Sequence, residues 1–199
     1  MSAESAAPDP IARFLALFET AKSTPGHADA TAMTLATVGA EGRPSARIVL
    51  LKGVDNGGLV FYTNTHSRKG RELAANKHAA LDFWWPHIGW QVRFEGDVAP
   101  VTAAEADAYF ASRARGSQLG AWASDQSATL NSRAELEARL VEVTRRYEGQ
   151  PVPRPPHWSG YRLTPIAVEL WRNREDRLHE RELYTRTDDG SWTVRLLNP

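Results

Sequence analysis

Residues 32–63 read AMTLATVGAEGRPSARIVLLKGVDNGGLVFYT and indicate the fold class. Three apolar runs in this stretch predict short strands over 32–38, 45–51 and 59–63. The segments between them, Gly39–Gly42 and Asp55–Gly58, have the glycine content of tight turns. Because strands joined by such short turns run in opposite directions, we expect an antiparallel sheet.

The rest of the chain adds more strands than helices. Helices are expected to begin at Pro10, Ser67, Thr102 and Ser132, where Asp9 or a hydroxyl residue provides an N-cap. Further strands are predicted over 79–85, 90–101, 163–171, 177–187 and 192–197. This pattern predicts an α+β fold, an antiparallel split β-barrel with helices packed outside. We expect residues 9–199 to form a single domain after a disordered tail over residues 1–8.

The composition excludes several classes of protein. The 199 residues carry 24 basic and 24 acidic side chains, a balance that does not suit a nucleic-acid-binding protein. Cysteine is absent, which excludes disulfides and a thiol nucleophile, and the six histidines are scattered, so we expect no metal site. No signal peptide or membrane-spanning apolar run is visible, and a cytoplasmic location is expected.

Cations gather at two places that suit anions. Ser67-Arg68-Lys69-Gly70 sets two cations in the first turn of a helix, where they oppose the helix dipole unless an anion lies there. Arg47 and Lys52 bracket an apolar strand and point to opposite faces of it. We therefore predict sites for two phosphate groups, one on a cofactor and one on a substrate. The alternative at residues 67–70 is an exposed basic turn.

A further group of residues that suits binding of a phosphate lies between Tyr109 and Ser127. Tyr109 and Arg113 are four residues apart, which predicts that they share one face of a helix. Ser117 follows where Gly116 would end that helix. A phenol, a guanidinium and a hydroxyl group together suit a phosphorylated small molecule. The alternative is a solvated helix face that runs into a glycine-bearing loop.

These segments resemble the pyridoxamine 5'-phosphate oxidase family of FMN enzymes. The resemblance rests on Arg47–Lys52, on Tyr109–Ser127 and on Arg177–Arg181, and it runs from about Thr31 to Pro199. It implies an FMN-binding split barrel that forms a homodimer, with FMN at the interface of the two chains. The FMN ligands that it implies are Arg47, Ile48, Val49, Leu50, Leu51, Lys52, Tyr62, Thr63, Arg68, Lys69, Gln91, Gln126, Ser127, Trp171 and Arg181.

The resemblance also implies a reaction. FMN would take a hydride equivalent from C4' of pyridoxamine or pyridoxine 5'-phosphate, and dioxygen would reoxidise it with release of hydrogen peroxide. Arg177 and His179 would act at the reacting carbon. The implied substrate-binding residues are Lys52, Tyr109, Arg113, Ser117, Arg177, Leu178 and His179.

Two alternatives stay open. One is the phenazine-biosynthesis flavin oxidase branch of the same family, whose tricyclic substrate has no phosphate to bind. The other is a non-enzymatic module that binds a flavin or pyridoxal phosphate. Ser5–Asp9 stands where many members have an arginine-rich segment, so closure of a lid over the site is an open question.

Overall fold

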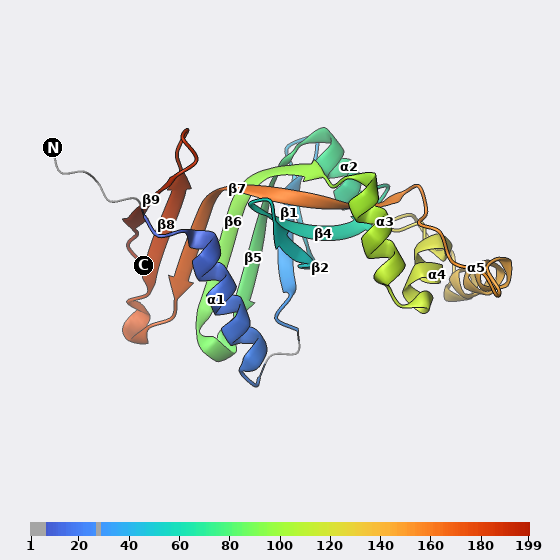
Figure 1. The fold of residues 1–199 in the computed structure, drawn as a ribbon, viewed down its shortest axis with the longest axis horizontal. Helices are drawn as coiled ribbons and strands as arrows, with labels where there is room; N and C mark the ends of the chain where they lie inside the picture. The colour runs from blue at the N-terminus through green and yellow to red at the C-terminus, as the bar shows by residue number, and fades with distance from the viewer. Residues whose placement is uncertain (1–6, 27–28) are drawn as a thin grey trace.

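The structure is a computed structural model, which describes residues 7–26 and 29–199. Nine strands are present in the described residues: β1 (Ala32–Val38), β2 (Pro44–Leu50), β3 (Gly53–Asp55), β4 (Gly58–Asn64), β5 (His78–Trp85), β6 (Trp90–Pro100), β7 (Trp158–Arg172), β8 (Glu180–Arg186) and β9 (Trp192–Leu196). They form one antiparallel sheet in the order β2-β1-β5-β6-β7-β4-β3, and β8 and β9 extend it from β7. Figure 1 shows the β8–β9 hairpin at one end of an elongated molecule.

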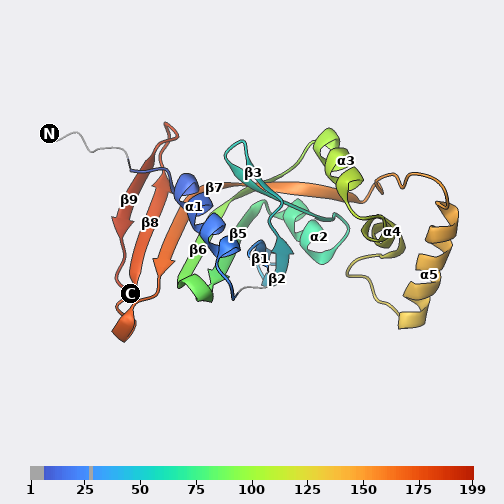
Figure 2. The same ribbon diagram turned by 60° about the horizontal axis from the view of Figure 1, so that its bottom comes forward.

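Helices cover the sheet and extend the other end of the molecule. They are α1 (Pro10–Ser23), α2 (Arg68–Ala75), α3 (Ala103–Ser112), α4 (Arg115–Ala123) and α5 (Arg133–Arg146). α1 crosses one face of the sheet, whereas α3, α4 and α5 gather at the end opposite β8 and β9 (Figures 1 and 2). The predicted caps are present, since Asp9 accepts from the Ile11 N–H and Thr102 forms a capping box with Glu105. None of the helices described is long and apolar enough to cross a membrane.

The long strand β7 joins the parts of the sheet. It pairs with β4 near its start, with β6 along most of its length and with β8 near its end. The register with β6 shifts between Glu95 and Gly96, which leaves Ile166 of β7 as an extra, bulged residue. Gly96 has no space for a side chain, because a Cβ there would lie 2.1 Å from the carbonyl oxygen of Thr164.

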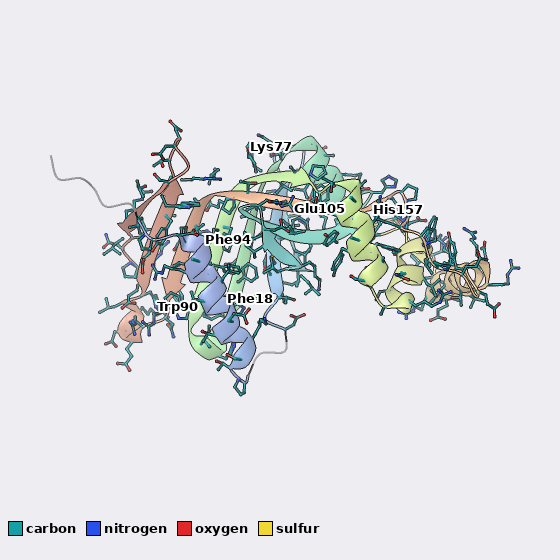
Figure 3. All side chains as sticks on the ribbon, viewed as in Figure 1. Phe18, Lys77, Trp90, Phe94, Glu105 and His157 are labelled. Carbon is teal, nitrogen blue, oxygen red and sulfur yellow. The ribbon has the colours of Figure 1, made fainter. Side chains whose placement is uncertain are left out.

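An aromatic cluster fills the space between α1 and the sheet. Phe14 is fully buried, and its ring centroid lies 5.0 Å from that of Phe83, 5.9 Å from Trp85 and 4.9 Å from Phe94. Phe18, one turn further along α1, stacks on Phe14 at 5.9 Å. Figure 3 labels Phe18 on the helix and Phe94 on the strand behind it. Apolar burial and edge-to-face ring contacts therefore attach α1 to the sheet.

The predicted α+β class is confirmed, but four local predictions differ from the structure. β3 was not predicted and reaches into the predicted turn at Asp55, α4 begins where we predicted that the preceding helix would end, and β7 begins at Trp158 rather than at residue 163. The strand predicted over 177–187 begins at Glu180, because Asp176 and Arg177 have φ values of 53° and 60° that no strand accommodates.

The predicted tail lies mostly outside the described residues, which begin at Ala7. The Ala7 N–H donates to the carbonyl of Trp192 at 3.2 Å, so the chain is already attached to β9 at that position. The division into a tail and a single domain stays a prediction.

We expect Phe14→Ala to lower the free energy of unfolding by about 3–5 kcal/mol, because it removes the ring at the centre of the aromatic cluster. Chemical denaturation followed by tryptophan fluorescence measures this change. The matched control is Leu15→Ala on the same helix, where the side chain is 39% exposed and the loss should be much smaller. Equal losses in the two variants would show that α1 is not held through Phe14.

Candidate active site

A cleft of about 700 Å³ opens between the β2–β4 side of the barrel and the helices α3 and α4. Many of the predicted site residues line it: Ile48, Val49, Leu50, Lys52, Tyr62, Thr63, Lys69, Tyr109, Arg113, Ser117 and Gln126. Other lining residues were not predicted: Asn64, Ala114, Gly120, Ala121, Ser124 and Trp158. Ile48 is 63% exposed, so one flank of the cleft is apolar and uncovered in a single chain.

Lys52 enters the cleft where the chain passes from β2 to β3. Its backbone N–H donates to the carbonyl of Val60 on β4 at 2.8 Å. The preceding Leu51 is buried in the core, so the alternation of side chains along an extended segment turns Lys52 the other way, to the cleft. Leu51 itself, a predicted FMN ligand, is a core residue whose side chain does not line the cleft.

Arg113 reaches the cleft from a break between two helices. α3 ends at Ser112, and Arg113 has an extended backbone (φ −71°, ψ 148°), so the prediction that it continues the helix of Tyr109 is wrong. The guanidinium lies 4.8 Å above the ring of Trp158. Its Nη1 is buried and has no hydrogen-bond partner among the described residues, and this burial lowers the pKa of Arg113. A half-buried cation with a buried donor atom that has no partner among the described residues is suited to an anionic ligand.

Ser117 lies in the first turn of α4 rather than after a helix end. Gly116 is inside α4 and does not end the preceding helix, which corrects the predicted role of this glycine. Ala114 and Ser117 line the cleft, so the N-terminal end of α4 faces it. The dipole of a helix favours anions at this end.

Stacked aromatic rings form the wall of the cleft. Tyr62 stacks on Tyr109, with ring centroids 4.0 Å apart, and on Trp158 at 5.3 Å. Gly160 makes this arrangement possible, because a Cβ at that position would lie 2.6 Å from the Tyr62 ring. Burial raises the pKa of Tyr62, so its phenol stays protonated and can donate a hydrogen bond.

A second group of cations lies where α2 meets β2. Arg47 and Arg68 both donate to Glu72, at 3.0 and 2.9 Å. The Lys69 ammonium donates to Thr63 Oγ1 at 3.1 Å and to Gln126 Oε1 at 2.9 Å. Burial, and after it the charge of Arg47, lowers the pKa of Lys69.

Ser127 follows Gln126 with a φ of 73°, a left-handed conformation that is unusual outside glycine. Neither Arg47, Arg68 nor Ser127 lines the cleft itself.

The remaining predicted residues lie together at the other end of the sheet. Gln91 faces Trp171 across β6 and β7, and Trp171 faces Arg181 across β7 and β8. The rings of Trp171 and His179 lie 4.4 Å apart. Figure 3 labels Trp90, next to Gln91, and His157, next to Trp158, at opposite ends of the sheet, so one chain does not bring this group to the cleft.

Arg177 and His179 are close to this second group but are not on a strand. Arg177 belongs to a short 3₁₀ turn over Glu175–Arg177. Leu178 is 70% exposed, so its side chain does not point into the core. Left-handed conformations at non-glycine residues such as Arg177 and Ser127 cost roughly 1–3 kcal/mol each and often mark functional sites.

Two important residues were missed in the sequence. Trp158 begins β7 directly after the proline-rich segment 151–157, and nothing in the sequence connects it to Tyr62. Glu72 could have been found, because it stands four residues after Arg68 on one face of the predicted helix.

The curled antiparallel sheet, its outer helices and the cationic cleft define a split barrel whose cleft is suited to an anionic small molecule. The chain belongs to the pyridoxamine 5'-phosphate oxidase family: the family model described as "Pyridoxamine 5'-phosphate oxidase" matches residues 23–147. A second model, described as "Pyridoxine 5'-phosphate oxidase C-terminal dimerisation region", matches residues 158–199. The resemblance identified in the sequence is therefore confirmed.

Relatives and solved structures agree with this family. A pyridoxine/pyridoxamine 5'-phosphate oxidase from Myxococcus xanthus is 59% identical, over 96% of this chain and 92% of the relative, and one from Sphingopyxis alaskensis is 56% identical, over 96% and 88%. PhzG from Burkholderia lata, solved with tetrahydrophenazine-1-carboxylic acid, has a TM-score of 0.87 at 33% identity and covers 98% of this chain and 95% of its own. A related FMN-binding protein from Nostoc punctiforme shares the fold, with a TM-score of 0.78 at 21% identity over 97% and 100%. The predicted split-barrel fold is thus confirmed.

Proposed function

We propose that the protein is an FMN-dependent oxidase of pyridoxamine 5'-phosphate and pyridoxine 5'-phosphate. The products are pyridoxal 5'-phosphate and hydrogen peroxide, with dioxygen as the electron acceptor. The amine substrate also consumes one water and releases its nitrogen as ammonia. The observation that supports this most directly is the buried Nη1 of Arg113, which lines the cleft without a hydrogen-bond partner among the described residues. The named relatives at 54–59% identity favour the same substrates.

The chain offers two separate cationic groups, as two phosphates require. Lys52, Arg113 and the N-terminal end of α4 face the cleft and would hold the substrate phosphate together with the hydroxyl groups of Tyr109 and Ser117. Arg47 and Arg68, which donate to Glu72, and Lys69, which donates to Thr63 at the edge of the cleft, would hold the FMN phosphate. Against these three cations stands the single carboxylate of Glu72, and the excess of about two charges matches a phosphate monoester dianion.

FMN, when bound, supplies the two-electron acceptor for oxidation at C4' of the substrate and returns the electrons to dioxygen. The protein binds and orients the substrate beside it. The aromatic wall of Tyr62, Tyr109 and Trp158 excludes water from one side of the cleft. In this proposal Arg177 lies over the pyridine ring of the substrate and assists loss of the proton at the C4' substituent. His179 donates a hydrogen bond to the oxygen substituent of that ring.

We propose that the site is completed in a homodimer, with FMN at the interface. In one chain, Gln91, Trp171, Arg177 and His179 lie at the opposite end of the sheet from the cleft. A second copy would bring its own residues of this kind to the open, apolar flank at Ile48. The family description of residues 158–199 as a dimerisation region supports this arrangement. The cytoplasmic location stays a prediction.

A phenazine-type oxidation is the second candidate, because the structure of PhzG is similar over nearly the whole chain. That substrate has no phosphate, so it would leave Arg113 without an anionic partner. The relatives named pyridoxine/pyridoxamine 5'-phosphate oxidase are also more similar in sequence, at 59% against 33% identity. A binding module without catalysis is the third possibility, and turnover decides it.

The purified protein should be a yellow homodimer that binds FMN more tightly than riboflavin and releases hydrogen peroxide with pyridoxamine 5'-phosphate. Flavin absorbance, light scattering and a peroxide-coupled assay measure these three properties. Pyridoxamine without its phosphate should be a poor substrate, because Arg113 and Lys52 would lose their ligand. Faster turnover of a phosphate-free tricyclic substrate would support the phenazine alternative, and FMN binding without turnover would support a binding module.

Arg113→Ala should raise the KM for pyridoxamine 5'-phosphate about tenfold to a hundredfold, because hydrogen bonds to a charged group contribute about 1.5–3 kcal/mol. FMN content should stay normal. Steady-state kinetics normalised to bound FMN measure this effect. The control is Arg133→Ala, an exposed arginine of α5 paired with Glu137, which should behave as the wild type. Loss of FMN at an unchanged KM would show that the two phosphate sites are assigned the wrong way round.

Arg177→Leu should lower kcat and kcat/KM together while FMN occupancy is unchanged, the pattern of a contact made chiefly in the transition state. His179→Asn should act more on KM. Arg174→Leu, on the same loop and paired with Glu180, is the control and should keep a near-normal kcat. A wild-type rate in Arg177→Leu would contradict the catalytic assignment.

A further inference from the structure

Glu72 of α2 is a buried carboxylate that belongs to no wall of the cleft. Only 8% of the residue is exposed. It accepts hydrogen bonds from Thr37 Oγ1 at 2.6 Å, Ser45 Oγ at 2.7 Å, Arg47 Nη2 at 3.0 Å and Arg68 Nε at 2.9 Å. One side chain therefore connects β1, β2 and the first turn of α2.

The two carboxylate oxygens of Glu72 accept hydrogen bonds from different residues. Oε1 accepts from Arg68, and Oε2 accepts from Thr37, Ser45 and Arg47. Arg47 is fixed further, because its Nη1 donates to the carbonyl of Leu35 at 3.2 Å. Among the described residues no second contact of this kind anchors Arg68, and its side chain is 61% exposed. Glu72 is thus the contact that holds Arg68 in one orientation.

Arg68 is bound in a way that leaves most of its donors available. Its described hydrogen bond to Glu72 uses Nε, and the two terminal amino groups make no bond to the described residues. A guanidinium held at Nε presents these groups as a fork, the geometry that binds phosphate oxygens in pairs. Ordering such a side chain before the ligand arrives removes part of the entropic cost of binding.

We propose that Glu72 is a positioning residue that orders Arg68 and Arg47 for the phosphate of FMN. This inference rests on the proposed function, since it concerns the cofactor assigned there. Glu72 itself does not touch the ligand. It sets the directions of two arginines that come from different elements, β2 and α2, so that both can bind one phosphate group.

A negative charge so close to a phosphate site also repels the ligand, and the two effects must be compared. The repulsion is limited, because the carboxylate of Glu72 already accepts hydrogen bonds from Thr37, Ser45, Arg47 and Arg68. Removal of Glu72 would release Arg68 from its described contact, and we expect this loss of order to outweigh the loss of repulsion.

The test compares the affinities of FMN and riboflavin for the flavin-free dimer, measured by quenching of flavin fluorescence. We expect Glu72→Ala to weaken FMN binding about tenfold, the loss of one charge-assisted hydrogen-bonded contact, and to leave riboflavin binding unchanged. Glu72→Gln retains one acceptor oxygen and should lie between Glu72→Ala and the wild type. If Glu72→Ala is too unstable to purify, Glu72→Gln carries the same comparison. The control is Glu182→Ala, which removes a carboxylate paired with Arg13 and Tyr184 away from the cleft.

A double-mutant cycle tests whether Glu72 affects FMN binding through Arg68. Adding Glu72→Ala to Arg68→Ala should weaken FMN binding much less than it does in the wild type, because Arg68 is already gone and Arg47 keeps its contact with the carbonyl of Leu35. Equal weakening of FMN and riboflavin would mean a merely structural role, and tighter FMN binding would mean that repulsion dominates; either result overturns the proposal. A wild-type protein that does not prefer FMN to riboflavin would instead overturn the proposed cofactor, and this inference with it.

Discussion

The hydrogen-bonded pairing of β7 with three other strands is the constraint on which the rest of the structure depends. Near its start β7 pairs with β4 and supplies Trp158 and Gly160 to the cleft. Near its end it pairs with β8 and presents Trp171 beside His179. Because a β-ladder fixes distances along the strand, these two groups of residues are held apart within one chain. The proposed dimer follows from this separation more than from any single contact.

In and beside the cleft, some charged side chains lie in surroundings that do not stabilise the folded protein. Burial lowers the pKa of both Arg113 and Lys69, whereas hydrogen bonds from four side chains hold the pKa of Glu72 at about 2. The carboxylate therefore stays charged at any physiological pH, while the nearby cations lack full compensation. Sites that must bind anions commonly keep such uncompensated charge, and an aromatic scaffold such as that around Trp158 holds it in place.

The sequence predicted most strands and caps, because side-chain alternation and N-cap residues are local signals. It did not predict α4, where Gly116 and Gly120 disfavour a helix and tertiary contacts decide instead: Leu119 is buried, and Gln118 donates to the carbonyl of Phe110 at 3.0 Å. The turn at Arg177 gave no signal either, since its left-handed residues are not glycines. Cleft residues that are close in sequence were correctly predicted to lie together. The sequence did not predict that Gln91 and Trp171 lie far from them, because this distance depends on the order of the strands in the sheet.

The bulge at Ile166 has a consequence for how the chain tolerates change. Tyr161 and Leu163 point to the core before it, whereas Val168 and Leu170 do so after it, so the extra residue reverses the parity of β7. Deleting one residue here would turn Val168 and Leu170 outward and bring the next positions, including a charged glutamate, into the apolar interior. We therefore expect a deletion in this strand to be tolerated less well than a substitution of the bulged Ile166, whose own side chain is largely exposed.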